Sequence, residues 1–391
     1  MRRISISERR ARLARRHRLA PGHRARDVVE AARSMVCLHG TNSSTVYLSA
    51  WARVEGMTVS DLDRAWYVDR SLVKHLAMRR TLFVFPRETM GFAQAGASDR
   101  VATAERRRLV RDVERAGLFD DGERWLVDAS EEVLAALSDG REATSSELRA
   151  EIPVLEGSIV YGEGKSWGGS MSIGPRVLTT LSAAGQIVRA SNDGAWTASR
   201  PRWTLMASWL GDEIPRCSEA EGLVRLVEAW LRTFGPGTEA DIKWWLGSTV
   251  ASVRRALADL GALDVDLDGE RGYVLPDDVE AAEPVEPWAA LLPTLDPTTM
   301  GWKERDWYLG PRGSVLFDSS GNAGPTVWWD GRVVGGWSQR RDGEIVYRLL
   351  EDVGSEAEAA VEAEAGQLEG WLGDVRLSPG FLPPFQRALT A

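Results

Sequence analysis

The sequence repeats one short pattern three times: a threonine, two variable residues, an acid and an aliphatic residue. The copies begin at Thr58, Thr144 and Thr238, so they are 86 and 94 residues apart. In each copy the threonine hydroxyl can accept a hydrogen bond from the backbone N–H three residues on. The acid at that position can accept one from the threonine N–H. Each copy therefore predicts the start of a helix, and the repeat predicts three related units.

The same kinds of segment follow each copy. A second helix is predicted over residues 69–80, 175–184 and 249–260. Segments with β character come next, at 81–85, 186–197 and 264–275, and Asp268-Gly269 is a typical hairpin turn. Helix, turn, helix and hairpin make up the winged-helix layout, a variant of the helix-turn-helix motif. The alternative is a general α+β protein in which three capped helices coincide.

The last part of the chain differs in composition and in its predicted secondary structure. Residues 276–290 are rich in Asp, Glu, Ala and Pro and are typical of a linker. Short strands are predicted at 314–317, 326–329 and 332–335, before an acidic helix over 353–372. The predicted fold class is therefore α+β, with three tandem winged-helix units followed by a small C-terminal β-barrel or sandwich. The expected boundaries are 1–100, 101–212, 213–280 and 281–391.

The charge is distributed unevenly along the chain. The net charge is −9, yet residues 1–100 carry 19 Lys and Arg against 9 Asp and Glu. The remainder carries 29 against 48. A basic end on an acidic chain favours a face that meets a polyanion. The alternative is an Arg-rich surface that contacts only solvent.

Composition also limits the compartment and the kind of site. No apolar run approaches the roughly 20 residues that span a bilayer. The Arg-rich start lacks the apolar stretch of a secretory signal, although a transit peptide has a similar composition. Cys37 and Cys217 have no metal-ligand spacing. We expect a cytoplasmic monomer with no membrane segment, disulfide, metal or small-molecule cofactor.

Four stretches of the chain carry a family resemblance. They are Phe234–Gly247, Leu291–Pro297, Gly321–Thr326 and Asp330–Trp337. With these motifs the chain resembles the winged-helix DNA-binding family of AlkZ/YcaQ-like DNA glycosylases over nearly its whole length. The resemblance implies three winged-helix units and a β-barrel that form a cradle around duplex DNA. It also implies excision of N-alkylated purines, including bulky and crosslinked adducts, without a metal.

The resemblance places the candidate catalytic residues in the first unit. Characterised members carry Gln-x-Gln or Gln-x-Asp within Leu-Gln-x-Gln/Asp-Asp-Pro, and the matching stretch here is Val36–Asn42. His39 therefore occupies the first catalytic position and Thr41 the second, while Gly40 replaces an apolar spacer and Asn42 an aspartate. A neutral imidazole offers one acceptor nitrogen and can act as a general base, and the Thr41 hydroxyl can hold the same water. The alternative is a structural histidine that caps or bonds within the core.

The candidate DNA contacts lie in two segments. Residues 72–83 match a family stretch that usually reads Arg-Gly-Thr-Leu-His, from which Arg80 and Phe83 depart. The second segment, 302–306, resembles a family hairpin near DNA. The predicted DNA-binding residues are Lys74, Arg79, Arg80, Thr81, Trp302, Lys303 and Arg305, with phosphate contacts expected from the basic side chains. His17 and His23 are expected to contact phosphate or solvent, and His75 to pack or contact DNA.

These expectations lead to one function and two alternatives. The leading hypothesis is a DNA glycosylase that hydrolyses the N-glycosidic bond of alkylated or bulky purine adducts in duplex DNA. The first alternative is a non-catalytic winged-helix DNA-binding protein, either a regulator or a lesion sensor, that has lost the family's glutamines. The second is an enzyme that acts on a different adduct.

Overall fold

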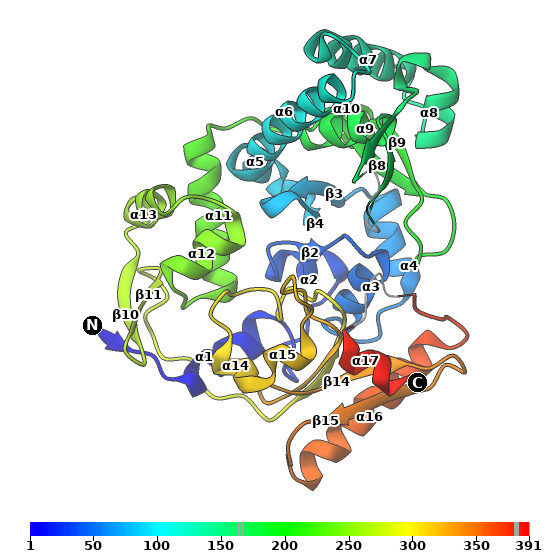
Figure 1. The fold of residues 1–391 in the computed structure, drawn as a ribbon. Coiled ribbons are helices and arrows are strands. Elements are labelled where there is room, and N and C mark those ends of the chain that lie inside the picture. Colours follow the sequence, from blue (N-terminus) through cyan, green and yellow to red (C-terminus); the bar gives the residue numbers. More distant parts are fainter. Residues whose placement is uncertain (163–164, 166–167, 379–382, 391) are drawn as a thin grey trace.

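The computed structural model describes residues 1–162, 165, 168–378 and 383–390, and its fold is a mixed α+β fold. Figure 1 shows the N-terminal part, in blue, at the centre of the molecule. The segments in cyan to green with α6–α9 lie above it, α11–α13 lie beside it, and the orange and red C-terminal segments lie below.

One element order occurs three times. It is a helix, a short strand, two helices and a β-hairpin, with the short strand paired to the second hairpin strand. The first copy contains α2 (Val28–Ser34), β2 (Leu38–His39), α3 (Ser43–Trp51), α4 (Val59–Asp63), β3 (Leu72–Ala77) and β4 (Thr81–Pro86). A π-helical turn over Arg64–Val68 extends α4. The sheet order is β2-β4-β3.

The second copy inserts a hairpin between its helices. It contains α7 (Gly122–Ala136), β5 (Ala143–Thr144), α8 (Ser145–Glu151), α9 (Gly174–Ala183), β8 (Ile187–Asn192) and β9 (Pro201–Leu205), and its sheet order is β5-β9-β8. The inserted hairpin is β6 (Ser158–Tyr161) and β7 (Gly169–Ser172). The elements α5 (Met90–Ala93) and α6 (Asp99–Arg115) come before this copy, and α10 (Met206–Leu210) ends it.

In the third copy a single bridge takes the place of the short strand. The copy contains α11 (Glu219–Phe234), α12 (Glu239–Leu246), α13 (Val250–Asp259), β10 (Leu263–Leu267) and β11 (Glu270–Val274). Gly237 forms an antiparallel bridge with Tyr273. The N-terminal strand β1 (Arg2–Arg3) pairs in parallel with β10, and α1 (Ile6–Arg16) follows it.

The three predicted capping sequences do begin helices. The carboxylates of Asp61, Glu147 and Asp241 accept the N–H of their threonines at 2.8, 2.6 and 3.0 Å. In the first copy, however, the capping sequence lies one helix later than in the other two. Thr144 and Thr238 cap α8 and α12, which follow the short strand, whereas in the first copy Asn42 caps that helix and Thr58 caps the next one.

The predicted helix over 69–80 is therefore wrong, because this stretch contains strand β3. A capping box marks where a helix starts but does not show which helix of a unit it is. Once the helix at Thr58 is the last of its unit, the next segment must be the hairpin. Six consecutive buried residues, Leu72–Ala77, fit a strand covered on both faces.

The C-terminal part is an open sheet and not the predicted barrel. The strands β12 (Ala289–Leu292), β13 (Thr326–Trp329), β14 (Arg332–Gln339) and β15 (Ile345–Leu349) follow one another in antiparallel order. Helix α16 (Ser355–Leu372) buries Val361 and Leu368 against this sheet, so the apolar face is covered without closure. The predicted strand at 314–317 is wrong, because α15 (Gly313–Leu316) lies there, between α14 (Asp306–Leu309) and β13; α17 (Pro384–Leu389) ends the chain. A short apolar run fits either state.

The cores join the parts differently. Most core residues of the second copy form one cluster with part of α6, from Leu109 to Trp203. A larger cluster is shared by the first copy, the third copy and the segment that follows it, and it also includes Val188 and Ala190 of the second copy. Trp230, Trp302, Trp328 and Trp337 are buried within the protein, as expected for core-filling tryptophans. Within the described ranges, no helix is long and apolar enough to cross a membrane.

Candidate active site and nucleic-acid interface

His39 lies in β2, where it is paired with Phe83 of β4. Its ring meets the Phe83 ring edge-on, with 5.4 Å between the centroids. Only 6% of the residue is exposed. Its Nδ1 is buried without a hydrogen-bond partner among the described residues. Nδ1 therefore makes no hydrogen bond within the described core, and both the catalytic and the structural role of His39 stay predictions.

The surroundings keep the His39 ring neutral. Burial, together with the smaller effects of the positive charges of Arg79 and Lys74, lowers its pKa to about 3, against the opposing effect of Asp296. At pH 7 the imidazole is uncharged, so one ring nitrogen carries a lone pair that can accept a hydrogen bond. A base with so low a pKa is weak, but it is in the accepting form over the whole physiological range.

The residues that follow His39 turn the chain into α3. The Gly40 N–H donates to the Leu82 carbonyl at 2.7 Å. A Cβ at position 40 would lie 3.3 Å from that carbonyl oxygen and from Val84 Cγ2, which explains why a glycine replaces the apolar spacer. Asn42 caps α3 by accepting from the Ser44 N–H at 3.2 Å. Thr41 is exposed, so only one member of the predicted catalytic pair is buried.

A buried ion pair connects α3 to the segment before β13. Arg53 donates to both carboxylate oxygens of Asp296, at 2.7 and 2.9 Å, and both side chains are fully buried. Ser49 also donates to Asp296, and Thr298 accepts from Arg53. The His17 Nδ1 lies 2.8 Å from the Thr298 hydroxyl, and the ring is buried. His17 therefore does not contact phosphate or solvent as predicted, and the network fixes α3 next to β2.

Two of the predicted DNA-binding arginines meet on one tryptophan. The guanidinium carbon of Arg79 lies 4.0 Å from the Trp244 ring centroid, and that of Arg305 lies 4.9 Å from it. These residues come from the β3–β4 turn, α12 and the segment before α14. Burial and, to a smaller extent, the nearby positive charge of Arg305 together lower the pKa of Arg79 to about 10. The fold thus brings cations from two distant segments together on Trp244, and the charge of one of them, Arg79, also acts on His39.

The other predicted DNA-binding residues have different outcomes. Arg80 is exposed and forms an ion pair with Glu105 at 2.7 Å, Lys303 is exposed, and Thr81 is half-buried. Trp302 is 2% exposed and donates to the Phe234 carbonyl at 3.0 Å, so its ring lies in the core, and its DNA contact stays a prediction. Lys74 and His75 lie buried on a strand and not on the surface of a helix. Burial lowers the pKa of Lys74 to about 7.

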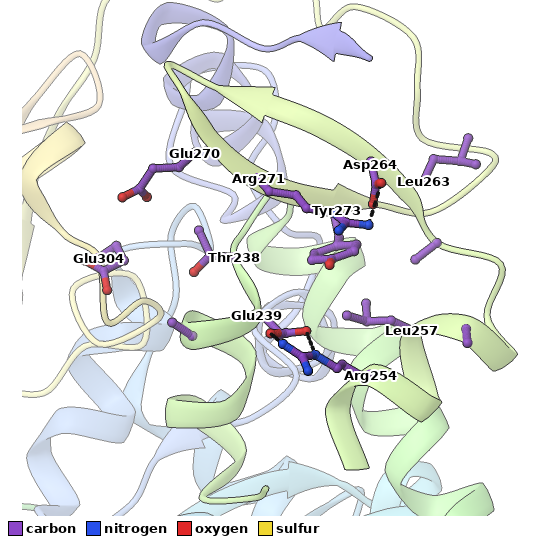
Figure 2. A pocket seen from close by; sticks show the side chains of 13 residues that line it. Thr238, Glu239, Arg254, Leu257, Leu263, Asp264, Glu270, Arg271, Tyr273 and Glu304 are labelled. Atoms are coloured by element: carbon purple, nitrogen blue, oxygen red, sulfur yellow. Dashed lines mark hydrogen bonds and ion pairs between the residues drawn. The ribbon is translucent and has the colours of Figure 1, made fainter. Parts of the chain in front are cut away.

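A cavity of about 910 Å³ lies elsewhere, in the third copy, where α12, α13 and the β10–β11 hairpin line it. Figure 2 shows the ion pairs Arg254–Glu239 and Arg271–Asp264 on its walls, each at 2.6 Å, with Tyr273 between them. Glu270 and Glu304 also line it. Carboxylates outnumber guanidinium groups there, so this cavity does not suit a phosphate backbone.

Comparison with known proteins decides the family. The family model described as DNA glycosylase AlkZ-like matches residues 32–371. This chain belongs to the AlkZ-like DNA glycosylase family. The family supports DNA binding and a DNA glycosylase role. The fold is similar to that of Streptomyces sahachiroi DNA glycosylase AlkZ, with a TM-score of 0.74 and 24% sequence identity over 96% of this chain and 98% of that one. No curated protein matches the chain significantly.

Sequence reasoning missed several residues of the AlkZ-like site. Asp296 lies in the motif Leu291–Pro297, but nothing in the sequence shows that it pairs with Arg53, 243 positions away. Trp244 lies in the motif Phe234–Gly247, but nothing in the sequence shows that Arg79 and Arg305 lie over its ring. Among the residues that the structure places, no three His, Cys, Asp or Glu side chains are grouped to hold a metal ion.

Proposed function

We propose that this AlkZ-like chain hydrolyses the N-glycosidic bond of alkylated or bulky purine adducts in duplex DNA, with His39 as the residue that positions the water. The observation that supports this best is the neutral, buried imidazole at the family's first catalytic position, whose Nδ1 has no hydrogen-bond partner among the described residues. The charge of Arg79 acts on this ring, and Arg79 and Arg305, which share Trp244, suit the phosphates on either side of a lesion.

The proposed chemistry begins with a purine that is already cationic, because it is alkylated at N7 or N3. The bond between C1′ and the base nitrogen breaks, and the base leaves as a neutral molecule with the bonding electron pair. The oxygen of a water then bonds to C1′, and the proton that it loses passes through the imidazole to solvent. His39 holds that water as an acceptor, and the exposed Thr41 hydroxyl approaches it from the turn.

A cationic base should not meet strong positive charge in the site. Lys74 lies in strand β3 of the same sheet, and burial lowers its pKa to about 7, which weakens its positive charge at physiological pH. His39 is uncharged there. The remaining cations, Arg79 and Arg305, are the groups that phosphates neutralise when DNA binds. The proposed site therefore discriminates little against a cationic lesion once the duplex is in place.

We propose that the three copies of the repeated element order are winged-helix units. In that layout the last helix before each hairpin is the one that approaches a groove. These helices are α4 with its π-helical turn, α9 and α13. A protein that acts on the genome in this way would be expected in the cytoplasm or nucleoid.

The test is base release from a panel of duplexes. Each duplex carries one lesion: N7-methylguanine, N3-methyladenine or a bulky N7-alkylguanine. Abasic sites are revealed by alkaline strand cleavage. The proposal expects release from at least one lesion duplex and none from an undamaged duplex. Tight binding to the lesion duplexes with no release from any of them would instead support the non-catalytic lesion sensor.

A further inference from the structure

A second cavity lies beside the candidate site and is lined mainly by arginines. It has a volume of about 440 Å³ and is formed by the β3–β4 turn, α6 and the end of α12. Its charged lining residues are Arg79, Arg80, Arg100, Arg108, Arg111 and Glu105. Neither the family match nor the resemblance assigns a role to the arginines of α6.

The positive charge of this cavity is only partly compensated. Glu105 forms ion pairs with Arg80 at 2.7 Å and with Arg108 at 3.7 Å. Arg100 reaches Glu219 at 3.9 Å. Within the described part of the chain, Arg79 and Arg111 have no carboxylate within 4 Å. Five guanidinium groups around a single lining carboxylate leave a strong positive potential, which an anion would relieve.

The arrangement follows from the helical repeat of α6. Arg100, Arg108 and Arg111 are spaced by eight and three residues, so they lie on one face of the helix, with Ala104 between them. The small Ala104 side chain leaves room above the helix. Gly247 closes the opposite side, where its positive φ of 59° and its closeness to Arg79 disfavour a larger residue.

We infer that this arginine-lined cavity holds a backbone phosphate of the duplex, next to the nucleotide that is presented to His39. The inference rests on the proposed function and specifies how the duplex is positioned. Arg79 belongs both to this cavity and to the cluster with Trp244 and Arg305, so a phosphate held here lies next to the candidate site. Guanidinium groups suit phosphate oxygens because their donors form a planar fork.

The test is the salt dependence of binding to an undamaged duplex. Arg108→Gln with Arg111→Gln removes two exposed guanidinium groups from the cavity. Arg107→Gln with Arg115→Gln removes the same charge from the same helix, outside the lining, and serves as the control. Each lost phosphate contact should lower the slope of log Kd against log salt by about 0.9. We expect a decrease of about 0.9 for the cavity variant, since one phosphate contact is lost, and no more than a small decrease for the control.

Two results would overturn the inference. One is an equal slope for the two double variants while the wild type binds the duplex. The other is tight binding of inorganic phosphate or pyrophosphate together with those equal slopes, which would assign the cavity to a small phosphorylated ligand. Because the duplex is undamaged, absence of base release in the lesion panel would overturn the proposed activity and leave this inference standing. A wild type that binds no duplex would overturn both.

Discussion

Arg53 and Asp296 form a bidentate ion pair that is fully buried, with the shortest nitrogen–oxygen distance at 2.7 Å. They are 243 residues apart, so the pair joins the helix behind His39 to the segment between β12 and β13. Removing one partner of such a pair strands the other charge in a low-dielectric interior. The motif Leu291–Pro297 is thus structural, even though it identifies a family of enzymes.

Asp296→Asn is therefore expected to lower the free energy of unfolding by about 3–5 kcal/mol. Asp268→Asn is the matched control, because Asp268 pairs with Arg3 in an exposed ion pair. The control should change stability by no more than about 0.5 kcal/mol. Urea denaturation of both variants measures the difference. Equal stability of the two variants would contradict the role assigned to the buried pair.

Gly247→Ala should have two effects. Its φ of 59° disfavours any residue with a Cβ, which costs about 1 kcal/mol of stability. The new Cβ would also lie 3.1 Å from Arg79 Cγ, and so would displace the guanidinium group from the cavity and from Trp244. We expect duplex binding to weaken by about 1 kcal/mol, or roughly fivefold.

Gly261→Ala separates these two effects. Gly261 has the same φ of 59°, but its nearest neighbour is Pro276 Cγ at 3.8 Å. This variant should lose similar stability and keep the wild-type affinity for the duplex. Thermal unfolding and fluorescence anisotropy report the two quantities. If both variants bound DNA equally well, Arg79 would not be the group through which position 247 acts.

Three buried histidines predict a loss of stability in mild acid. Burial lowers the pKa of His39 to about 3 and that of His75 to about 4, and it lowers the pKa of His17 well below its usual range. In the unfolded chain each titrates near 6.5. Below that pH the unfolded state binds more protons than the folded state. The free energy of unfolding therefore decreases as the pH is lowered, until the pH reaches the pKa of the folded state.

Between pH 7.5 and pH 5.0 each of these histidines should reduce the free energy of unfolding by about 2 kcal/mol. His75→Leu removes one of them at a position buried on a strand. The variant should therefore show a decrease about 2 kcal/mol smaller than that of the wild type, measured by urea denaturation at the two pH values. The same pH dependence in both proteins would show that the buried ring does not titrate in this way.

Sequence and structure agree where a local rule acts alone. The capping residues and the third hairpin, with its Asp268-Gly269 turn, could be predicted because a few neighbouring side chains decide them. The frame of the first unit could not, because Asn42 and Thr58 both cap helices. Only the pairing of β2 with β4, 44 to 46 residues away, decides which helix precedes the hairpin.

The candidate site shows the same division. His39 was found through a motif, and its burial follows from long-range pairing. Trp302 lies in a segment that resembles a family hairpin near DNA, but its ring packs among Phe234, Trp307 and Tyr308 in the core. Conversely, the sequence of α6 predicts only an ordinary charged helix. The fold brings Arg79 and Arg80 of the β3–β4 turn opposite its arginines, and this creates the cavity. Contacts between distant segments decide these cases.

The account rests most on His39, and one measurement tests it directly. It is the single-turnover release of N7-methylguanine from a duplex by the wild type, His39→Ala and His39→Gln at pH 7.5. His39→Gln restores the residue expected from the family resemblance, whose amide oxygen can also accept from water, so it should react within about tenfold of the wild type. His39→Ala should be slower by at least about 100-fold. Release by His39→Ala at the wild-type rate would contradict the account.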